Sequence, residues 1–189
     1  MIVKVIPNGE LQENCYILTL PGRDDAILID PGSEPENIRA ELGAKKAAAI
    51  LLTHGHWDHT GALKDFPGVP IYIHELDAPM LSVSRFSAGG FRRQLEERPA
   101  PTDFVTEGQI LKIAGLTLQV IHTPGHTPGG VCYIAGSDIF TGDTIFDGDY
   151  GRTDLPGGSM QQMRQSLRRL LAMQGLYAHP GHGASFFIS

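Results

Sequence analysis

Short apolar runs, each bounded by Pro, Gly, Asn or Asp, recur along the whole chain and predict β-strands. The first three runs suggest an antiparallel meander. The run at 47–52 is apolar throughout, which is typical of a strand covered on both faces. We expect strands at 2–6, 15–20, 26–30, 47–52, 70–73, 110–113, 116–121, 131–134, 138–140 and 176–179.

Helix signals punctuate these strands. Ser33 and Glu36 have the spacing of a capping box, and Gly43 stands where such a helix would end. A second cap, Ser159 with Gln162, precedes an apolar stripe formed by Met163, Leu167, Leu170 and Leu171. A shorter helix is expected at 58–64. Strands followed by a helix, twice over, predict an α/β fold in which two sheets pack together with helices outside, as one four-layer domain over residues 1–189.

Composition and charge indicate a globular protein and argue against several other classes. Of 189 residues 41% are apolar, which excludes a disordered chain, and the net charge of −6 argues against a nucleic-acid partner. No run approaches the roughly 18 apolar residues of a membrane span. Cys15 and Cys132 lie in apolar stretches, and the first residues do not have the pattern of a signal peptide, so we expect reduced core thiols and a cytoplasmic location.

The densest chemistry lies directly after the apolar run at 47–52. His54, His56, Asp58 and His59 fall within six residues, in the segment HGHWDH. In an extended turn His54 and His56 point the same way, whereas Asp58 and His59 begin the next helix and face a second point. One segment can therefore serve two metal ions. Imidazole and carboxylate ligands without thiolate suit zinc, and also iron or manganese.

Three later segments also end apolar runs with compact polar turns: 122–130, 141–146 and 179–183. Each offers one further ligand, namely His126, Asp143 and His182. We expect one ion to be held by His54, His56 and His126, the other by Asp58, His59 and His182, with Asp143 bridging them. Coordination positions left open for water are what catalysis requires.

These residues carry a family resemblance. The segment HGHWDH matches the HxHxDH signature of the metallo-beta-lactamase superfamily, and the order of the later ligands also matches. Within that superfamily the chain most resembles small glyoxalase II-like hydrolases, through ENCYIL, LIDPGSEPENI, LLTHGHWDHTGAL, HTPGHTPGG, TGDTIF, GRTDLPGGS and PGHG. The resemblance covers nearly the whole chain. It implies an alpha-beta-beta-alpha sandwich with a dinuclear site at the sheet edges.

The chain ends seven residues after His182, so we expect it to lack the C-terminal helical domain that contributes glutathione contacts in larger glyoxalase II enzymes. Arginines in 75–104 either meet substrate carboxylates or lie on solvated faces; they are Arg85, Arg92, Arg93 and Arg98. Asp30 either orients a ligand imidazole or only shapes its turn. We expect structural roles for His74, His122, His179 and the pair Arg152 and Asp154, whereas Trp57 and Phe146 either wall the pocket or belong to the core.

The resemblance implies an enzyme that uses two divalent ions, most simply zinc, to cleave S-lactoylglutathione or a related small-molecule thioester with hydroxide. In it Asp58 both binds an ion and orients the hydroxide. One alternative is an iron-dependent persulfide dioxygenase, a relative that also has a GRTD segment. Another is a metal-binding or scaffold protein without activity. The oligomeric state is left open by the sequence.

Overall fold

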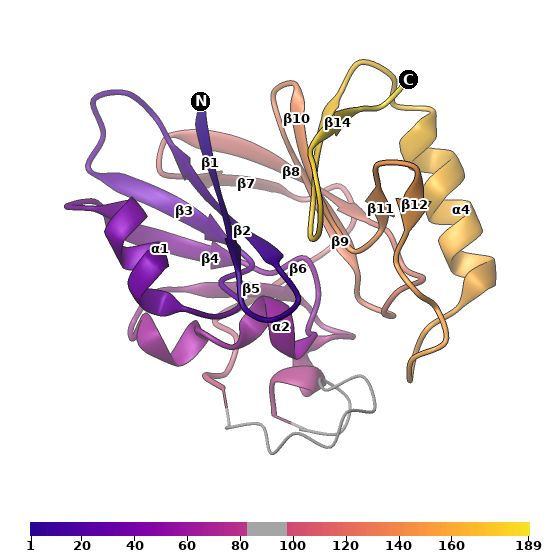
Figure 1. Cartoon of the computed structure of the whole chain (residues 1–189), viewed down its shortest axis with the longest axis horizontal. Coiled ribbons are helices and arrows are strands. Elements are labelled where there is room, and N and C mark those ends of the chain that lie inside the picture. Colours follow the sequence, from indigo (N-terminus) through magenta and orange to yellow (C-terminus); the bar gives the residue numbers. More distant parts are fainter. Residues whose placement is uncertain (83–97) are drawn as a thin grey trace.

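Two six-stranded sheets form the body of the molecule (Figure 1), in a computed structural model that describes residues 1–82 and 98–189. The expectations for Arg85, Arg92 and Arg93 fall outside these described residues. In spatial order the first sheet, sheet A, contains β1 (Ile2–Asn8), β2 (Glu13–Thr19), β3 (Asp25–Ile29), β4 (Lys46–Leu51), β5 (Ile71–His74) and β6 (Asp103–Val105). Strands β1, β2 and β3 form the predicted antiparallel meander, and β3 to β6 run parallel.

The second sheet, sheet B, is mostly antiparallel, with one parallel pair between β10 and β13. It contains β14 (Phe186–Phe187), β13 (Tyr177–Pro180), β10 (Asp138–Gly142), β9 (Val131–Ala135), β8 (Leu116–His122) and β7 (Ile110–Ile113). A separate small hairpin pairs β11 (Ile145–Phe146) with β12 (Asp149–Tyr150). The very short strands β6, β11, β12 and β14 were not predicted, because two or three residues are too few to show a periodic pattern.

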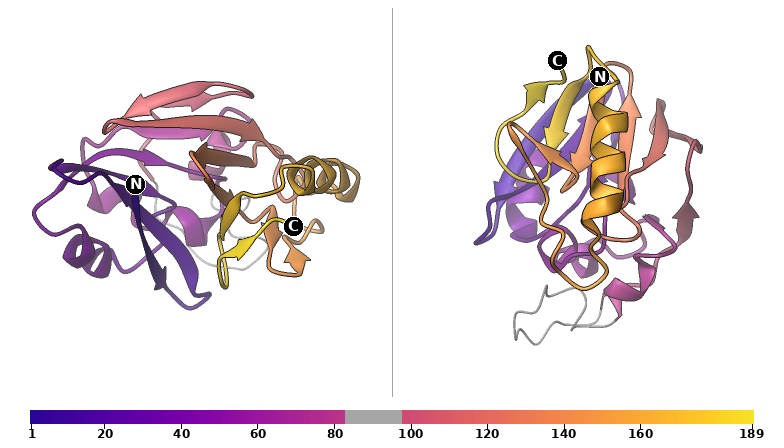
Figure 2. Two further views of the ribbon diagram at one scale, coloured as in Figure 1. Left: turned by 90° about the horizontal axis from the view of Figure 1, so that it is seen from above. Right: turned by 90° about the vertical axis from the view of Figure 1, so that its right-hand side faces the viewer.

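Apolar side chains fill three layers of contact, as the four-layer prediction requires. Between the sheets lie Tyr16, Leu18, Ile27, Leu51, Leu118, Val120, Tyr133 and Phe140. The outer face of sheet A is covered by α1 (Pro35–Leu42) through Ile38, and that of sheet B by α4 (Met160–Leu171) through Leu170. Helices α1 and α4 lie on opposite sides of the two sheets (Figures 1 and 2). The predicted alpha-beta-beta-alpha sandwich is therefore confirmed.

The helix caps were predicted with mixed success. Ser159 Oγ accepts a hydrogen bond from the Gln162 amide and caps α4 as expected, although Leu171 of its predicted apolar stripe is 48% exposed. The prediction of a capping box at Ser33 was wrong. The N-cap of α1 is Glu34, in a left-handed conformation, while Ser33 Oγ donates to Asn8 Oδ1 on β1. The Ser33 hydroxyl thus bonds to β1, which is distant in sequence, and does not cap the helix as the local pattern predicted.

The helix expected at 58–64 is interrupted. It consists of α2 (Trp57–Thr60) and a separate 3₁₀ turn, η1 (Leu63–Asp65). The Ala62 amide, which a continuous α-helix would direct to Asp58, donates instead to the Pro31 carbonyl, 3.1 Å away. The loop after β3 therefore ends α2 early and lies directly beside it.

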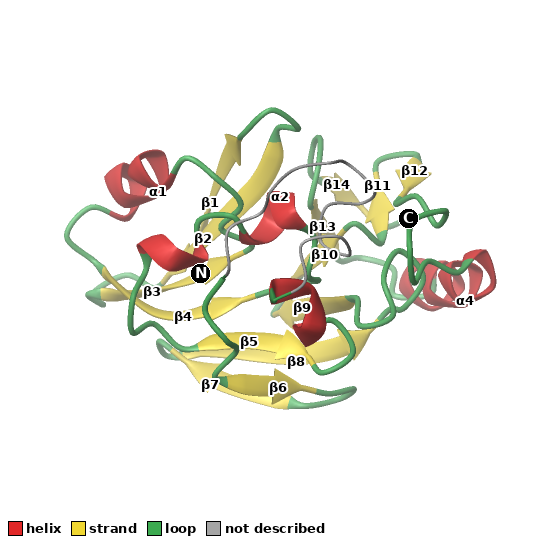
Figure 3. Ribbon diagram, turned by 90° about the horizontal axis from the view of Figure 1, so that it is seen from below, coloured by secondary structure: helices red, strands yellow, loops and turns green. Residues whose placement is uncertain are grey.

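Polar loops gather at one edge of the sandwich. Strands β3, β4 and β5 are parallel in sheet A, and β8, β10 and β13 share one direction in sheet B. The segments that follow the C-terminal ends of these strands meet around α2, as the view from below shows (Figure 3). Cys15 and Cys132 are free and buried, as predicted. Within the described residues, no helix is long and apolar enough to cross a membrane.

Candidate metal centre

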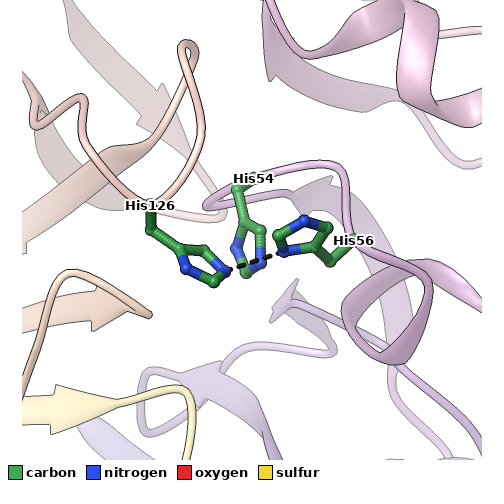
Figure 4. A group of neighbouring side chains, drawn as sticks. All are labelled: His54, His56 and His126. Atoms are coloured by element: carbon green, nitrogen blue, oxygen red, sulfur yellow. Dashed lines mark hydrogen bonds between the residues drawn. The ribbon is translucent and has the colours of Figure 1, made fainter. Parts of the chain in front are cut away.

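Three histidine rings from both sheets converge at the loop edge. His54 and His56 lie in the loop after β4, and His126 lies in the loop between β8 and β9. One ring nitrogen of each lies within 4.8 Å of the others, and all three side chains are buried. His56 Nδ1 is 2.8 Å from His126 Nε2, as the dashed line in Figure 4 marks. We call these residues the first trio.

A second group lies beside the first. Asp58 and His59 come from α2, and His182 follows β13, with ligand atoms again within 4.8 Å of one another. Asp58 Oδ2 is 3.7 Å from His59 Nε2 and 3.3 Å from His182 Nε2. We call Asp58, His59 and His182 the second trio.

Asp143 lies between the two trios, after β10. Its Oδ2 is 3.4 Å from His126 Nε2, in the first trio. Its Oδ1 is 3.4 Å from His59 Nε2 and 3.7 Å from His182 Nε2, in the second. One carboxylate oxygen thus faces each group, which is the arrangement of a bridging ligand. The structure brings together all seven side chains that the sequence analysis selected.

Hydrogen bonds outside the cluster determine which nitrogen of each ring faces inward. His126 Nδ1–H donates to the Arg152 carbonyl at 2.7 Å, and His182 Nδ1–H donates to the Leu11 carbonyl at 3.1 Å. Since a neutral imidazole carries one N–H, the Nε2 lone pair of both rings is left for the centre of the cluster. A ring fixed in this way is ready to bind a cation through Nε2.

Asp30, which follows β3, fixes two more rings. Its Oδ2 accepts from His59 Nδ1–H at 3.0 Å and from the Thr53 hydroxyl, and its Oδ1 accepts from the Thr53 amide at 2.7 Å. Because the Thr53 hydroxyl donates to Asp30, it can accept from His54 Nδ1–H, 3.1 Å away. Nε2 of His54 and of His59 therefore faces the cluster. Of the two roles considered for Asp30, this geometry fits the orienting one.

An Asp30→Asn substitution tests this orienting role. The amide NH₂ would face a ring N–H or the Thr53 donors, so His59 and Thr53 would lose a shared acceptor. We expect metal affinity to fall ~10- to 100-fold, the usual cost of losing such a partner. Chelator competition measures this change. Unchanged affinity in a folded Asp30→Asn protein would contradict the role.

Buried polar atoms without partners show that the cluster suits cations. Within the described residues, Nε2 of His54, Nε2 of His59 and Oδ1 of Asp143 have no hydrogen-bond partner, although all three are shielded from solvent. Buried lone pairs are costly unless something binds them. A positive ion in each trio would bind these atoms, and nitrogen and carboxylate donors of this kind suit zinc or iron. The donor set thus fits two metal ions.

Burial and neighbouring charges shift the pKa values in opposite directions across the cluster. Burial, and then His126, lower the pKa of His56 to about 3, and burial also lowers the pKa of His54 well below its usual value. For His59, burial acts in the lowering direction, but Asp143 and Asp58 outweigh it and raise the pKa well above the usual range. The acids thus concentrate negative charge on the side of the second trio.

A further acid at the centre was missed by the sequence analysis. Glu13, at the start of β2, is 1% exposed, and its Oε1 lies 3.7 Å from His59 Nδ1. Burial raises the pKa of this carboxyl well above its usual value. An acid at the first position of a strand normally reads as a solvent-facing residue, so the local pattern contains no signal for this contact.

An open pocket of about 220 Å³ adjoins the cluster. Its apolar walls are Leu11, Trp57, Phe146 and Leu155. Trp57 and Phe146 therefore line the pocket rather than the core. Arg152 also borders it, with its guanidinium in a bidentate ion pair with Asp154. Arg98 does not line this pocket; its guanidinium donates hydrogen bonds to the Thr60 and Trp57 carbonyls of α2 and so stabilises that helix.

The remaining histidines lie outside the two trios and make other contacts. His122 Nε2–H donates to the Pro128 carbonyl at 3.0 Å, and its ring stacks on His74 with centroids 4.3 Å apart. This stack joins the end of β8 to the end of β5. The two ring nitrogens of His179 are hydrogen-bonded to Asp138, in sheet B, and to Ser185, in the turn before β14. These contacts fit the structural roles expected for all three.

Comparisons with known proteins agree with this geometry. The family profile of the Metallo-beta-lactamase superfamily matches residues 8–182. The hydroxyacylglutathione hydrolase GloC of Haemophilus influenzae is 35% identical over 199 residues, covering 97% of this chain and 92% of that protein. The probable metallo-hydrolase YqgX of Bacillus subtilis is 35% identical over 174 residues, covering 88% of this chain and 82% of that protein.

Two solved structures are similar over nearly their whole length. TTHA1623 in a di-iron-bound form has a TM-score of 0.88 and 36% identity, covering 98% of this chain and 95% of that one. BLEG-1, a B3 metallo-beta-lactamase, has a TM-score of 0.92 and 31% identity, covering 99% and 94%. The di-iron form of the first agrees with the two-metal fit of the donor set described above.

Proposed function

Since this chain belongs to the metallo-beta-lactamase superfamily, we propose that it is a two-metal hydrolase that cleaves S-lactoylglutathione or a related thioester. Members of this superfamily are usually hydrolases, and similar proteins are named metallo-hydrolase and hydroxyacylglutathione hydrolase. The observation that carries the proposal is the position of Asp143, with one oxygen toward each group of inward-facing ring nitrogens.

We propose zinc as the natural metal. The first trio would hold one ion, Asp58, His59 and His182 the other, and Asp143 both. The His-rich, thiolate-free donor set suits zinc, while iron remains the alternative that the di-iron form of TTHA1623 supports. When bound, two such ions would lower the pKa of a water molecule, so that hydroxide is available near neutral pH, and would polarise a carbonyl oxygen.

The chain's own residues would do the rest of the chemistry. The Asp58 side chain is 12% exposed and borders the pocket, so its carboxylate can orient the attacking water and accept its proton. The apolar walls at Leu11, Trp57 and Leu155 would exclude bulk water from the acyl group. A thiolate leaves with little protonation, so cleavage of the thioester does not depend on a separate group that protonates the leaving sulfur.

The direct test is elemental analysis followed by a hydrolysis assay. We expect two zinc equivalents in the purified protein, and thiol release from S-lactoylglutathione that stops when a chelator removes the metal. Neutral thioesters and a β-lactam serve as comparison substrates. Oxygen uptake with glutathione persulfide, measured in parallel, is expected to be absent.

Three outcomes would overturn the proposal. One iron equivalent with persulfide oxidation would make the protein a dioxygenase. Two bound ions with cleavage of the β-lactam alone would make it a β-lactamase. Two bound ions with no turnover of any of these substrates would favour the non-catalytic, metal-binding alternative.

A further inference from the structure

A buried carboxylate outside the cluster joins two of its loops. Asp77 lies three residues after β5 and immediately before the 3₁₀ turn η2 (Ala78–Leu81), and its side chain is 0% exposed. Its Oδ1 accepts a hydrogen bond from the Gly129 amide at 2.7 Å, and its Oδ2 accepts from the Gly55 amide at 3.2 Å. Both donors are therefore main-chain groups of loops.

The two donors belong to the loops that carry the first trio. Gly55 lies between His54 and His56, after β4 of sheet A. Gly129 lies three residues after His126, between β8 and β9 of sheet B. A single carboxylate thus connects ligand loops that come from different sheets.

The approach of Asp77 to these loops is close enough to require glycine at both positions. A Cβ on Gly129 would lie 2.7 Å from Asp77 Cγ, and a Cβ on Gly55 would lie 2.9 Å from the Asp77 carbonyl and 2.6 Å from Met80 Cβ. Real side chains do not tolerate such distances. The spacing of glycines around the ligands therefore serves the contact with the turn at 77–80.

Burial of the Asp77 carboxylate costs desolvation free energy, which its hydrogen bonds must offset. Removal from water raises the pKa of the Asp77 carboxyl, while the Thr127 side chain and the amides of Gly129 and Gly55 favour the ionised form and oppose that rise. An apolar residue of similar size would avoid the desolvation cost but would leave two buried amide donors unpaired. What the carboxylate alone provides is two acceptors in one rigid plane, one for each loop.

We propose that Asp77 is a positioning residue of the metal centre: its two oxygens hold the loop of His54 and His56 against the loop of His126, so that all three rings meet at one ion. The inference rests on the two-metal site of the proposed function, but not on the thioester substrate.

The second trio is positioned by other groups. His59 is held by Asp30, and His182 by the Leu11 carbonyl. Loss of Asp77 should therefore affect one ion and spare the other. A general loss of folding would affect both, so the difference between the two sites separates positioning from mere stability.

Asp77→Asn is the test variant, since an amide offers one acceptor and places an NH₂ against the other loop's N–H. We measure zinc binding by two-step titration against a chelating indicator, and identify the liganded rings by histidine side-chain NMR. We expect affinity at the first trio to fall ~10- to 100-fold and affinity at the second to stay within twofold. Asp25→Asn, which removes a surface ion pair with Arg23, is the matched control and should change neither.

A measurement on the unmodified protein covers the case in which the variant fails to fold. In the metal-free protein the Gly55 and Gly129 amides should exchange with deuterium as slowly as strand amides, although both lie in loops. Exchange at the rate of open loops, or wild-type zinc affinity at the first trio of Asp77→Asn, would overturn the assignment. A wild type that binds two ions without cleaving thioesters would refute the proposed function and leave this inference standing.

Discussion

Asp143→Asn is expected to reduce thioester hydrolysis by at least ~10²- to 10³-fold, the scale on which single electrostatic groups at an active site contribute. The carboxylate places one oxygen 3.4 Å from His126 Nε2 and the other 3.4 Å from His59 Nε2. An amide keeps the shape but offers one neutral oxygen and a donor, so it cannot face both trios as an anion. Purified Asp143→Asn should therefore carry less than two metal equivalents.

The measurement is kcat/KM with S-lactoylglutathione, together with elemental analysis of the same sample. Asp25→Asn is again the control, because the Asp25 side chain forms a surface ion pair with Arg23 and belongs to neither trio. Circular dichroism of the metal-free variant shows whether it is folded. Two tightly bound ions and wild-type turnover in Asp143→Asn would contradict the bridging role.

Phe140→Ala is expected to lower the free energy of unfolding by about 3–5 kcal/mol, the usual cost of emptying a buried aromatic site. Phe140 lies on β10 between the two sheets and is 0% exposed. Its ring stacks on His179, with centroids 4.8 Å apart, and contacts Tyr16 edge-on at 5.2 Å. Few neighbours could close the cavity without moving both sheets.

Urea unfolding of the metal-free protein measures this loss, because bound ions would add their own stabilisation. Phe187→Ala is the matched control. Phe187 is 69% exposed, so its removal should change stability by no more than about 0.5 kcal/mol. Equal effects of the two substitutions would contradict the assignment of Phe140 to the core.

The ligand residues could be predicted from sequence because each stands at the end of an apolar run. His54, His56, Asp58 and His59 are also adjacent in the chain, so local spacing alone suggests a shared task. For Asp30 the sequence left two roles open, orienting a ligand imidazole or shaping the turn, since an Asp before Pro31 is also a common turn former. The structure supplied the missing fact, which is the 3.0 Å contact with His59 Nδ1.

Glu13 and Asp77 could not be predicted by this route. Neither lies in a histidine-rich segment, and each meets the centre through a fold contact with residues far away in sequence: Glu13 with His59, and Asp77 with Gly55 and Gly129. Ser33 is the opposite case, in which a local pattern predicted a contact that the structure does not contain. Its local pattern indicated a helix cap, but the approach of β1 gave its hydroxyl a different partner, Asn8.

Sequence by itself determined the longer strands, the layered architecture and the seven candidate ligands, because apolar runs and clustered imidazoles are properties of neighbouring residues. The tertiary structure alone decided which ring nitrogen faces inward, which carboxylates are buried behind the rings, and how loops of two sheets are held together. Those features depend on hydrogen bonds and desolvation between segments as much as 171 residues apart, as with Leu11 and His182. No local pattern records such distances, since only the packed fold brings these groups into contact.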